Sequence, residues 1–158
     1  MHPKLDYLKH SWQPIVDQIA SETGLHSILI MESLPGTMKV VCANQNQEVY
    51  KTGDEGPKSV QHGCHELYCE RVVNTGKELF VPNAADSEEW HGNEDLAKFG
   101  LGVYLGLPVI IDGKVCGTVC ALHNTPFDFL AGNQSARSWL LALQSKVHRD
   151  VESTRLGY

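Results

Sequence analysis

Four side chains that could do chemistry stand close together in one polar segment of the sequence. His62, Cys64, His65 and Cys69 can each bind a transition metal. Structural zinc sites normally take their ligands in pairs from two separated segments, which hold the ion tetrahedrally. Here one segment carries all four residues, so we interpret the histidines as surface polar groups and Cys69 as a core residue. We therefore expect no metal site.

Cys64 is the cysteine that best fits a reactive thiol. A nucleophilic thiolate needs a nearby cation or a helix N-terminus to lower its pKa. Cys64 lies near the start of a predicted helix and beside two histidines. The five cysteines show no disulfide framework, which indicates reduced thiols. No Ser-His-Asp order, phosphate-binding glycine loop or pair of catalytic carboxylates stands out, so we name no catalytic residue and favour a binding protein over an enzyme.

The size and charge of the chain limit what it can be. Its 158 residues, 42% of them hydrophobic, suit one domain spanning residues 1–158. The formal net charge of −6 and the pI of about 5.7 argue against nucleic-acid binding and give no cue for an anionic membrane surface. No apolar run could span a bilayer, and the N-terminus does not resemble a signal peptide, so we expect a cytoplasmic protein.

Two apolar runs around Asp112-Gly113 predict the central hairpin of the fold. Residues 103–111 and 115–122 are rich in Val and Ile, and Asp-Gly between such runs favours a type I′ turn with positive φ at both central residues. Both faces of each run are largely apolar, which predicts strands in the middle of a sheet that is covered on both sides. Pro108 cannot donate a ladder hydrogen bond, so we expect a bulge or an unpaired position there.

Apolar residues at helical spacing predict long helices at both ends of the chain. The first helix carries its row at Leu5, Leu8, Trp12, Ile15 and Ile19. Pro14 lies either in the first turn of a helix capped by Ser11 or at a kink in a longer helix, and Gly24 is the expected stop. The last helix carries its row at Ala136, Leu140, Leu143, Val147 and Val151.

Shorter elements are expected between the end helices. Residues 26–34 and 38–43 predict a first hairpin, with a turn at residues 34–37. The polar residues 44–63 are typical of a surface loop. Residues 64–73 and 93–99 predict short helices, and residues 79–82 predict a brief strand.

Several short motifs follow one another between residues 68 and 122. They are Tyr68-Cys69-Glu70, residues 75–84 (TGKELFVPNA), Asp86 and Trp90, residues 104–109 (YLGLPV), and residues 117–122 (GTVCAL). In their order and spacing they resemble a GAF domain, in particular those of bacterial sensor histidine kinases and diguanylate cyclases. The flanking helices and the first hairpin fit the same order, so the resemblance extends over nearly the whole chain.

The resemblance implies an α+β fold of the GAF/PAS-like kind. Its central antiparallel sheet would have five or six strands, with the terminal helices on one face and short helices and loops covering a small-molecule pocket on the other. It implies a sensory or signalling module whose ligand and cofactors are unknown. Because no residue follows Tyr158, we expect a module without its own output domain, which is either a stand-alone protein or a fragment of a sensor kinase or cyclase.

Two other functions stay open beside the sensory one. The first is a thiol-dependent reductase of a small oxidised substrate, similar to the free methionine sulfoxide reductases, working through Cys64 or Cys69. The spaced cysteines of that branch are not found in this sequence. The second is a module that serves only for dimerisation, with a collapsed pocket.

The residues expected to line the pocket come from segments 64–73 and 84–99 and from the central hairpin. They are Tyr68, Cys69, Trp90, Phe99, Tyr104, Thr118 and Cys120, with Leu122 as a further floor residue. Aromatic side chains supply large apolar area and, in Trp and Tyr, one hydrogen-bonding handle. The three aromatics of residues 90–104 could instead close the core beneath the acidic loop.

Alternation along the second arm of the central hairpin decides which side chains face the pocket. Cys116, Thr118, Cys120 and Leu122 share one face, and Val115, Gly117, Val119 and Ala121 share the other. We assign the first set to the pocket because it is the more polar, and a one-residue bulge would invert this assignment.

The last helix also carries apolar residues outside its main row. Trp139 and Leu141 are not needed for packing on a sheet, which takes one apolar stripe. Exposed apolar area of this kind is typical of an interface. We therefore predict a homodimer through the first and last helices.

Overall fold

Four α-helices and six strands make up the part of the chain that the computed structural model describes, residues 3–60 and 63–156. The helices are α1 (Pro3–Thr23), α2 (Tyr68–Thr75), α3 (Glu94–Phe99) and α4 (Ala136–Leu156), and a 3₁₀ turn, η1, covers Ala84–Asp86. The strands are β1 (Ser27–Ser33), β2 (Thr37–Ala43), β3 (Glu55–Pro57), β4 (Leu79–Val81), β5 (Val103–Ile111) and β6 (Lys114–His123).

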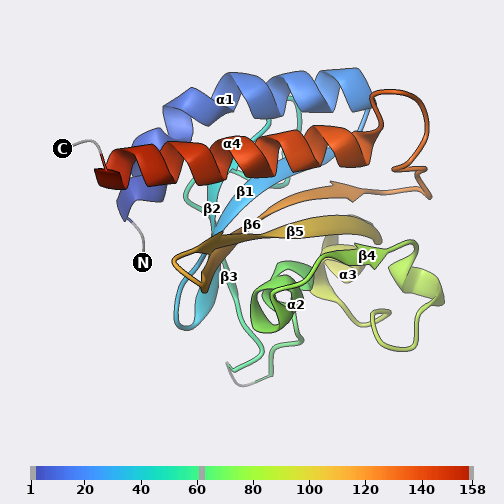
Figure 1. Ribbon diagram of the computed structural model, residues 1–158. Helices are drawn as coiled ribbons and strands as arrows, with labels where there is room; N and C mark the ends of the chain where they lie inside the picture. The colour runs from blue at the N-terminus through green and yellow to red at the C-terminus, as the bar shows by residue number, and fades with distance from the viewer. Residues whose placement is uncertain (1–2, 61–62, 157–158) are drawn as a thin grey trace.

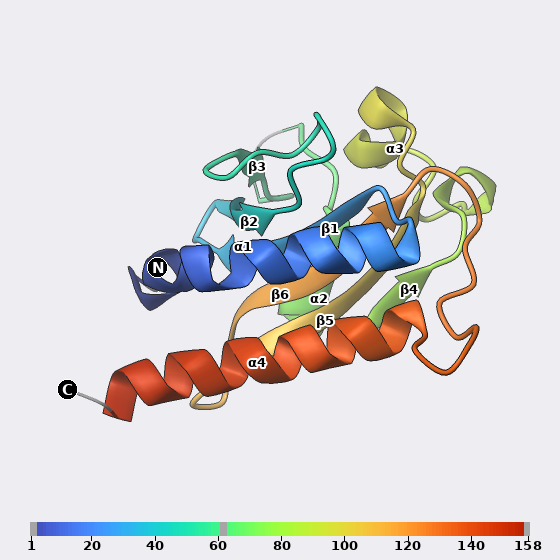
Figure 2. The same cartoon turned by 90° about the horizontal axis from the view of Figure 1, so that it is seen from above.

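The strands form one antiparallel sheet in the order β3-β2-β1-β6-β5-β4, with a layer on each face (Figure 1). Helices α1 and α4 lie side by side over one face, as the view from above shows (Figure 2). The segments from α2 to α3 cover the opposite face. This arrangement confirms the predicted α+β fold with an antiparallel sheet of six strands.

The two-layer covering divides the interior into two hydrophobic cores. Along β1, Ile28 and Ile30 contribute to the core beneath α1 and α4, whereas Leu29 and Met31 contribute to the core beneath α2. This alternation follows from the pleat of a strand, which sends successive side chains to opposite faces. Strands apolar on both faces, such as β1, β5 and β6, therefore occupy the middle of the sheet.

The central hairpin has the predicted turn. Asp112 and Gly113 have φ of 53° and 77°, as a type I′ turn requires. Strand β4 pairs only as far as Gly106 on β5, so it ends before it reaches Pro108. Pro108 is therefore unpaired on the β4 side, as expected, although it pairs with Thr118 of β6 on its other side. A register shift follows between Val109 and Ile110.

Helix α1 runs through Pro14 as one continuous element. Proline removes a hydrogen bond to the carbonyl four residues earlier, at His10. His10 and Pro14 are both exposed, so water can satisfy that carbonyl. Gly24 ends the helix with a left-handed φ of 76°. The helix is tied to α4 by the Trp12 indole N–H, which donates a 2.8 Å hydrogen bond to the Asp150 carboxylate.

Helix α2 begins four residues later than the sequence pattern suggested. Its start at Tyr68 is set by Glu70, whose carboxylate accepts hydrogen bonds from the backbone N–H groups of Leu67 and Ser59. The polar segment that precedes the helix is thereby folded back onto it. Cys64 lies in this segment and not in the helix, so the helix N-terminus expected beside its thiol is not there.

Strand β3 was not predicted, because residues 44–63 have the composition of a loop. Only three residues pair, Glu55–Pro57 against Thr37–Lys39 of β2, and they include a glycine and a proline. Tertiary contact rather than strand propensity therefore forms this edge.

Within residues 3–60 and 63–156, none of the helices combines the length and hydropathy needed to cross a bilayer.

Candidate functional site: a cavity between the sheet and helices α2 and α3

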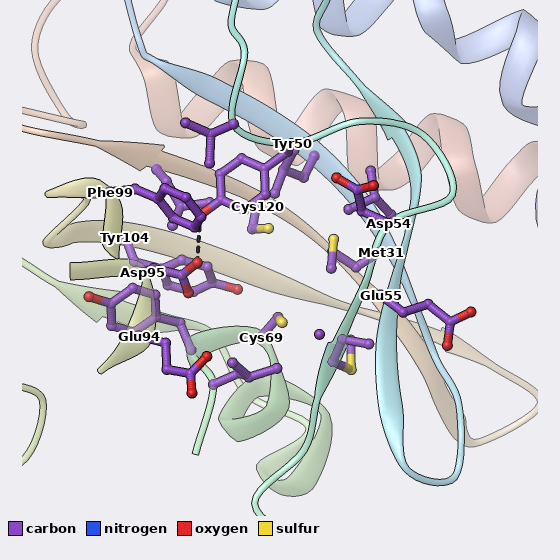
Figure 3. Close-up of a pocket in the computed structure, with 18 of the residues that line it drawn as sticks. Met31, Tyr50, Asp54, Glu55, Cys69, Glu94, Asp95, Phe99, Tyr104 and Cys120 are labelled. Atoms are coloured by element: carbon purple, nitrogen blue, oxygen red, sulfur yellow. Dashed lines mark hydrogen bonds between the residues drawn. The ribbon is translucent and has the colours of Figure 1, made fainter. Parts of the chain in front are cut away.

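A cavity of about 290 Å³ lies on the sheet face opposite α1 and α4. Its lining comes from four parts of the fold that are far apart in sequence (Figure 3). They are the middle strands, the segment from Val49 to Pro57, the start of α2, and α3. The volume is near the lower end of the range for small-molecule pockets, roughly 300–1,000 Å³.

The floor of the cavity is apolar and rich in sulfur. Leu29 and Met31 of β1 lie beside Cys120 and Leu122 of β6, which pair with β1 in the sheet. Met38 and Val40 extend the floor along β2. Cys120 and Leu122 therefore occupy the face that strand alternation predicted for them, while Val119 and Ala121 pack beneath the end helices.

Cys116 is an exception to that alternation, and here the prediction was wrong. Ile110 pairs with Val115 and Val109 pairs with Gly117, so Cys116 is the extra residue of a β-bulge. The bulge turns Cys116 into the core beneath the end helices, where its thiol donates to the Val109 carbonyl at 3.5 Å.

Tyr104 lies on the floor and stacks against Tyr68 of α2, with ring centroids 5.0 Å apart. Its ring occupies the space above Gly106, because a Cβ there would lie 2.2 Å from the tyrosine hydroxyl oxygen. Tyr104 is only 1% exposed. Among the residues that the structure describes, its hydroxyl has no well-formed hydrogen bond. The lining around it consists largely of sulfur and aromatic groups.

One wall is built by the segment that leads into β3, which we call the pocket loop (residues 44–54). Gln47 organises it: its side-chain oxygen accepts from the N–H groups of Val49 and Tyr50, and its amide donates to the carbonyl of Asn44 at 2.9 Å. Val49 and Tyr50 then line the cavity. Sequence reasoning missed this wall, and its one signal was this apolar pair inside a polar segment.

The opposite wall is helix α3, where Asp95 is the main polar group. The Tyr50 hydroxyl donates a 2.7 Å hydrogen bond to the Asp95 carboxylate across the cavity (Figure 3). Burial raises the pKa of Asp95 above its ordinary value, although the bond from Tyr50 acts in the opposite sense. Asn93 caps α3 by accepting from the Asp95 backbone N–H.

The thiols of the cavity are poor nucleophiles. Burial raises the pKa of Cys69 well above its ordinary value and raises the pKa of Cys120 to about 12. Both are therefore protonated at neutral pH, and the thiolate is the reactive form. Cys42, Cys69, Cys116 and Cys120 are free thiols.

Most of the residues expected in the pocket meet in this cavity. Tyr68, Cys69, Phe99, Tyr104, Cys120 and Leu122 all line it. Trp90 and Thr118 are not among its described lining residues. Trp90 packs behind Tyr68, with ring centroids 5.2 Å apart, and the Arg71 guanidinium lies 4.9 Å from the centroid of its indole. Thr118 is fully buried, and its hydroxyl donates towards the Cys120 sulfur at 3.8 Å.

Three members of the histidine and cysteine cluster, Cys64, His65 and Cys69, lie in the described part of the chain. His62 lies outside the described residues. Within the described ranges, no three His, Cys, Asp or Glu side chains come close enough to hold an ion. Cys64 is half-buried, and His65 lies beside Gly92, away from the cavity.

Comparison with solved structures shows the same fold in several proteins. The GAF domain of a phosphoenolpyruvate-protein phosphotransferase from Acinetobacter is 19% identical with a TM-score of 0.68, over 95% of this chain and 85% of that one. The type II free methionine-R-sulfoxide reductase of Thermoplasma acidophilum is 10% identical with a TM-score of 0.67, over 95% and 96%. The NreA protein of Staphylococcus aureus, in a form mutated in its nitrate binding site, is 19% identical with a TM-score of 0.56, over 81% and 95%.

At these identities the likeness shows the fold alone. A comparison with curated proteins gives no match. The GAF domain family, however, matches residues 8–143, which is most of the chain and includes both the sheet and the cavity. The chain therefore belongs to the GAF domain family.

Proposed function

We propose that this chain is a small-molecule-binding sensory module that works in the cytoplasm. The observation that carries the proposal is the cavity itself, a space of about 290 Å³ with an apolar floor, aromatic walls and a few polar groups. Small-molecule sites usually have this character. Proteins of the same fold include one with a nitrate binding site and a reductase in complex with its substrate, so the fold accommodates small ligands.

The position of the cavity suits a sensor that reports through its end helices. Leu29 and Met31 of β1 line the cavity, while Ile28 and Ile30 of the same strand pack beneath α1 and α4. Only one layer of strands separates the ligand from the helices. A ligand that moved β1 or β6 would therefore bias the packing of α1 against α4, which is the kind of two-state element that signalling requires.

A reductase is the less favoured function for this site. Reduction of a sulfoxide by a thiol begins with attack by a thiolate, and burial holds both cavity thiols in the protonated form. Cys64 is outside the cavity lining that the structure describes. The fold shared with free methionine-R-sulfoxide reductases therefore carries no argument for that activity here.

Filling the cavity tests the proposal directly. Gly56 lines the cavity, and a Cβ there would meet Leu67 at an ordinary contact distance of 3.5 Å, so Gly56→Leu should occupy the ligand space without a backbone clash. Native mass spectrometry of the protein purified from cells should show a non-covalent adduct that Gly56→Leu loses. In a second measurement, 2-phenylethanol added to the adduct-free protein should shift the NMR signals of cavity-lining amides, and the variant should not respond.

Gly92→Leu is the matched control, because Gly92 lies beside His65 outside the cavity and a Cβ there would meet only that ring, at 3.7 Å. This control should keep both the adduct and the response to 2-phenylethanol. A wild-type protein with no adduct and no response at about 10 mM 2-phenylethanol would contradict a binding function. Even a weak site with a dissociation constant of about 1 mM, a binding free energy of about −4 kcal/mol, would be mostly occupied at that concentration.

A further inference from the structure

The charge around the cavity is one-sided. Asp54 and Glu55 lie where the exposed end of the pocket loop meets β3, and Glu94 and Asp95 stand on α3 opposite them. Among the described lining residues the only cation is Lys98, and its ammonium is held by Glu94 at 3.3 Å. An anion that entered this space would meet like charge from both walls, whereas a cation would be attracted from both.

Asp95 is the carboxylate placed to hold such a cation. Its side chain faces the cavity and accepts a hydrogen bond from Tyr50 (Figure 3). A carboxylate has about four acceptor positions, so this bond leaves room for a further donor. A carboxylate withdrawn from water is costly unless it is paired, and a bound cation would offset that cost.

The aromatic side chains around Asp95 favour an organic cation over a hydrated metal ion. Tyr50 and Phe99 meet edge to face, with centroids 6.2 Å apart, where the pocket loop approaches α3. The faces of such rings attract ammonium groups. The floor below offers hydrocarbon and sulfur from Leu29, Met31 and Leu122, which suits the apolar body of a ligand but not a shell of water.

The Tyr104 hydroxyl is an independent sign that a ligand group is expected in the cavity. Tyr104 is 1% exposed and lines the cavity, and its hydroxyl makes no well-formed hydrogen bond within the described ranges, where its polar neighbours are the weakly bonding Cys120 thiol and the Thr118 hydroxyl. An unpaired buried hydroxyl costs about 1–3 kcal/mol. A ligand with a second polar atom in reach of this hydroxyl would satisfy it.

We propose that the cavity binds a small organic cation, with a protonated amine between Asp95 and the Tyr50 ring and an apolar or aromatic body over the β1–β6 floor. This proposal rests on the proposed function, because it names the chemical class of the ligand for the same site. It disfavours phosphate, nitrate and carboxylate ligands for this cavity, since Asp95 faces the cavity and three further carboxylates at its rim stand against one lysine.

Three probes of the same size and different charge test the class. They are 2-phenylethylammonium, the neutral 2-phenylethanol and the anion phenylacetate. Titrations of the adduct-free protein followed by NMR of the cavity-lining amides should give a dissociation constant for the cation at least about tenfold below those of the other two. Raising the salt concentration should narrow this preference, because exposed rim charges are screened.

Asp95→Asn should remove the preference for the cation over 2-phenylethanol. The amide keeps an acceptor oxygen for Tyr50 but carries no charge. Glu88→Gln is the matched control: Glu88 is exposed and outside the described cavity lining, and its loss changes the net charge equally. The control should keep the preference.

The outcomes separate this proposal from the function on which it rests. If 2-phenylethanol or phenylacetate binds as tightly as the cation, the cation class is wrong and the cavity remains a small-molecule site. If the preference survives in Asp95→Asn, Asp95 is not the counter-ion. If none of the three probes shifts the lining amides, both the ligand class and the binding function fail.

Discussion

Single side chains decide the chemistry that the cavity can support. Cys69 and Cys120 bring sulfur into the lining, but burial keeps their thiols protonated and unreactive. Asp95 keeps a carboxyl group in partly dehydrated surroundings, where its pKa is raised. The site therefore has the means to recognise a ligand by charge and shape, and it lacks an activated nucleophile among its described lining residues.

The raised pKa of Asp95 predicts how stability depends on pH. The folded protein binds a proton at Asp95 more tightly than the unfolded chain does, whose carboxyl titrates near 3.8. The stability contributed by this proton is fully present below the unfolded pKa and is lost as pH rises through the folded pKa. Asp95→Asn should therefore become more stable relative to wild type as pH rises from 3 to 7, measured by urea denaturation without ligand.

Glu94→Gln is the control for that series, because Glu94 also lies in the first turn of α3 but is more exposed to water. This variant also removes a carboxylate from the first turn, so it measures the part of the effect that comes from the helix dipole. The Glu94→Gln variant should show a smaller gain, because burial is the largest cause of the raised pKa of Asp95 and the charge of Glu94 is a lesser one. A difference between Asp95→Asn and wild type that stays constant or shrinks over this pH range would contradict the prediction.

At the scale of elements, the cavity depends on how closely β5 and α2 approach each other. The Tyr104 ring fits between the sheet and Tyr68 because position 106 has no Cβ. The motif YLGLPV therefore contains its glycine for a packing reason, not for a turn. The same glycine pairs with both neighbouring strands, opposite Leu79 of β4 and Cys120 of β6.

Gly106→Ala should push the Tyr104 ring off the floor of the cavity. The new methyl group would lie 2.2 Å from the hydroxyl oxygen and 2.6 Å from ring carbons, so the ring must move. Overpacking of this kind typically costs 1–3 kcal/mol. We expect a loss of free energy of unfolding of about that size, measured by urea denaturation, together with altered aromatic signals in NMR.

A double-mutant cycle with Tyr104→Ala tests the reason for that loss. If the clash with the ring causes it, Gly106→Ala should cost much less in the Tyr104→Ala background. An equal cost in both backgrounds would place the effect in the backbone of β5 and contradict the packing explanation.

At the scale of the whole molecule, the sheet separates a ligand side from a helix side. Helices α1 and α4 lie side by side over one face of the sheet (Figure 2), and apolar groups stand on the outer side of this layer. Tyr7 of α1 is 80% exposed, and Trp139 and Leu141 of α4 are only partly buried. We propose that this layer is the homodimer interface, which would place the cavities of the two copies on the outer faces of the dimer.

Tyr7→Glu should weaken the dimer and leave the fold intact, because the side chain is exposed on α1 and a charge in an apolar contact is costly. Light scattering at micromolar concentration should show a dimer for wild type and a shift towards monomer for the variant. Leu130→Glu is the matched control, since Leu130 is 72% exposed but lies in the loop before α4. A monomeric wild type at these concentrations would refute the interface.

The elements of the fold were readable from the sequence because each is set by local chemistry. Asp112-Gly113 between two apolar runs determines the central turn, since few residue pairs accept positive φ twice. Asn93 before two acidic residues determines the start of α3, and Gly76 the end of α2, where it takes a left-handed φ of 67°. The motif order was enough to indicate the family that residues 8–143 match.

The parts that escaped sequence reasoning are those created by contacts between distant segments. Strand β3 exists only because β2 offers an edge, and the face of Cys116 was inverted by a bulge that single-residue alternation does not show. The meeting of Tyr50 with Asp95 joins residues 45 positions apart. The sequence by itself determined the fold, the family and six of the cavity residues, because propensity, turns and alternation are local. Only the tertiary structure decided the polar character of the site, because that depends on which side chains the folded sheet brings together.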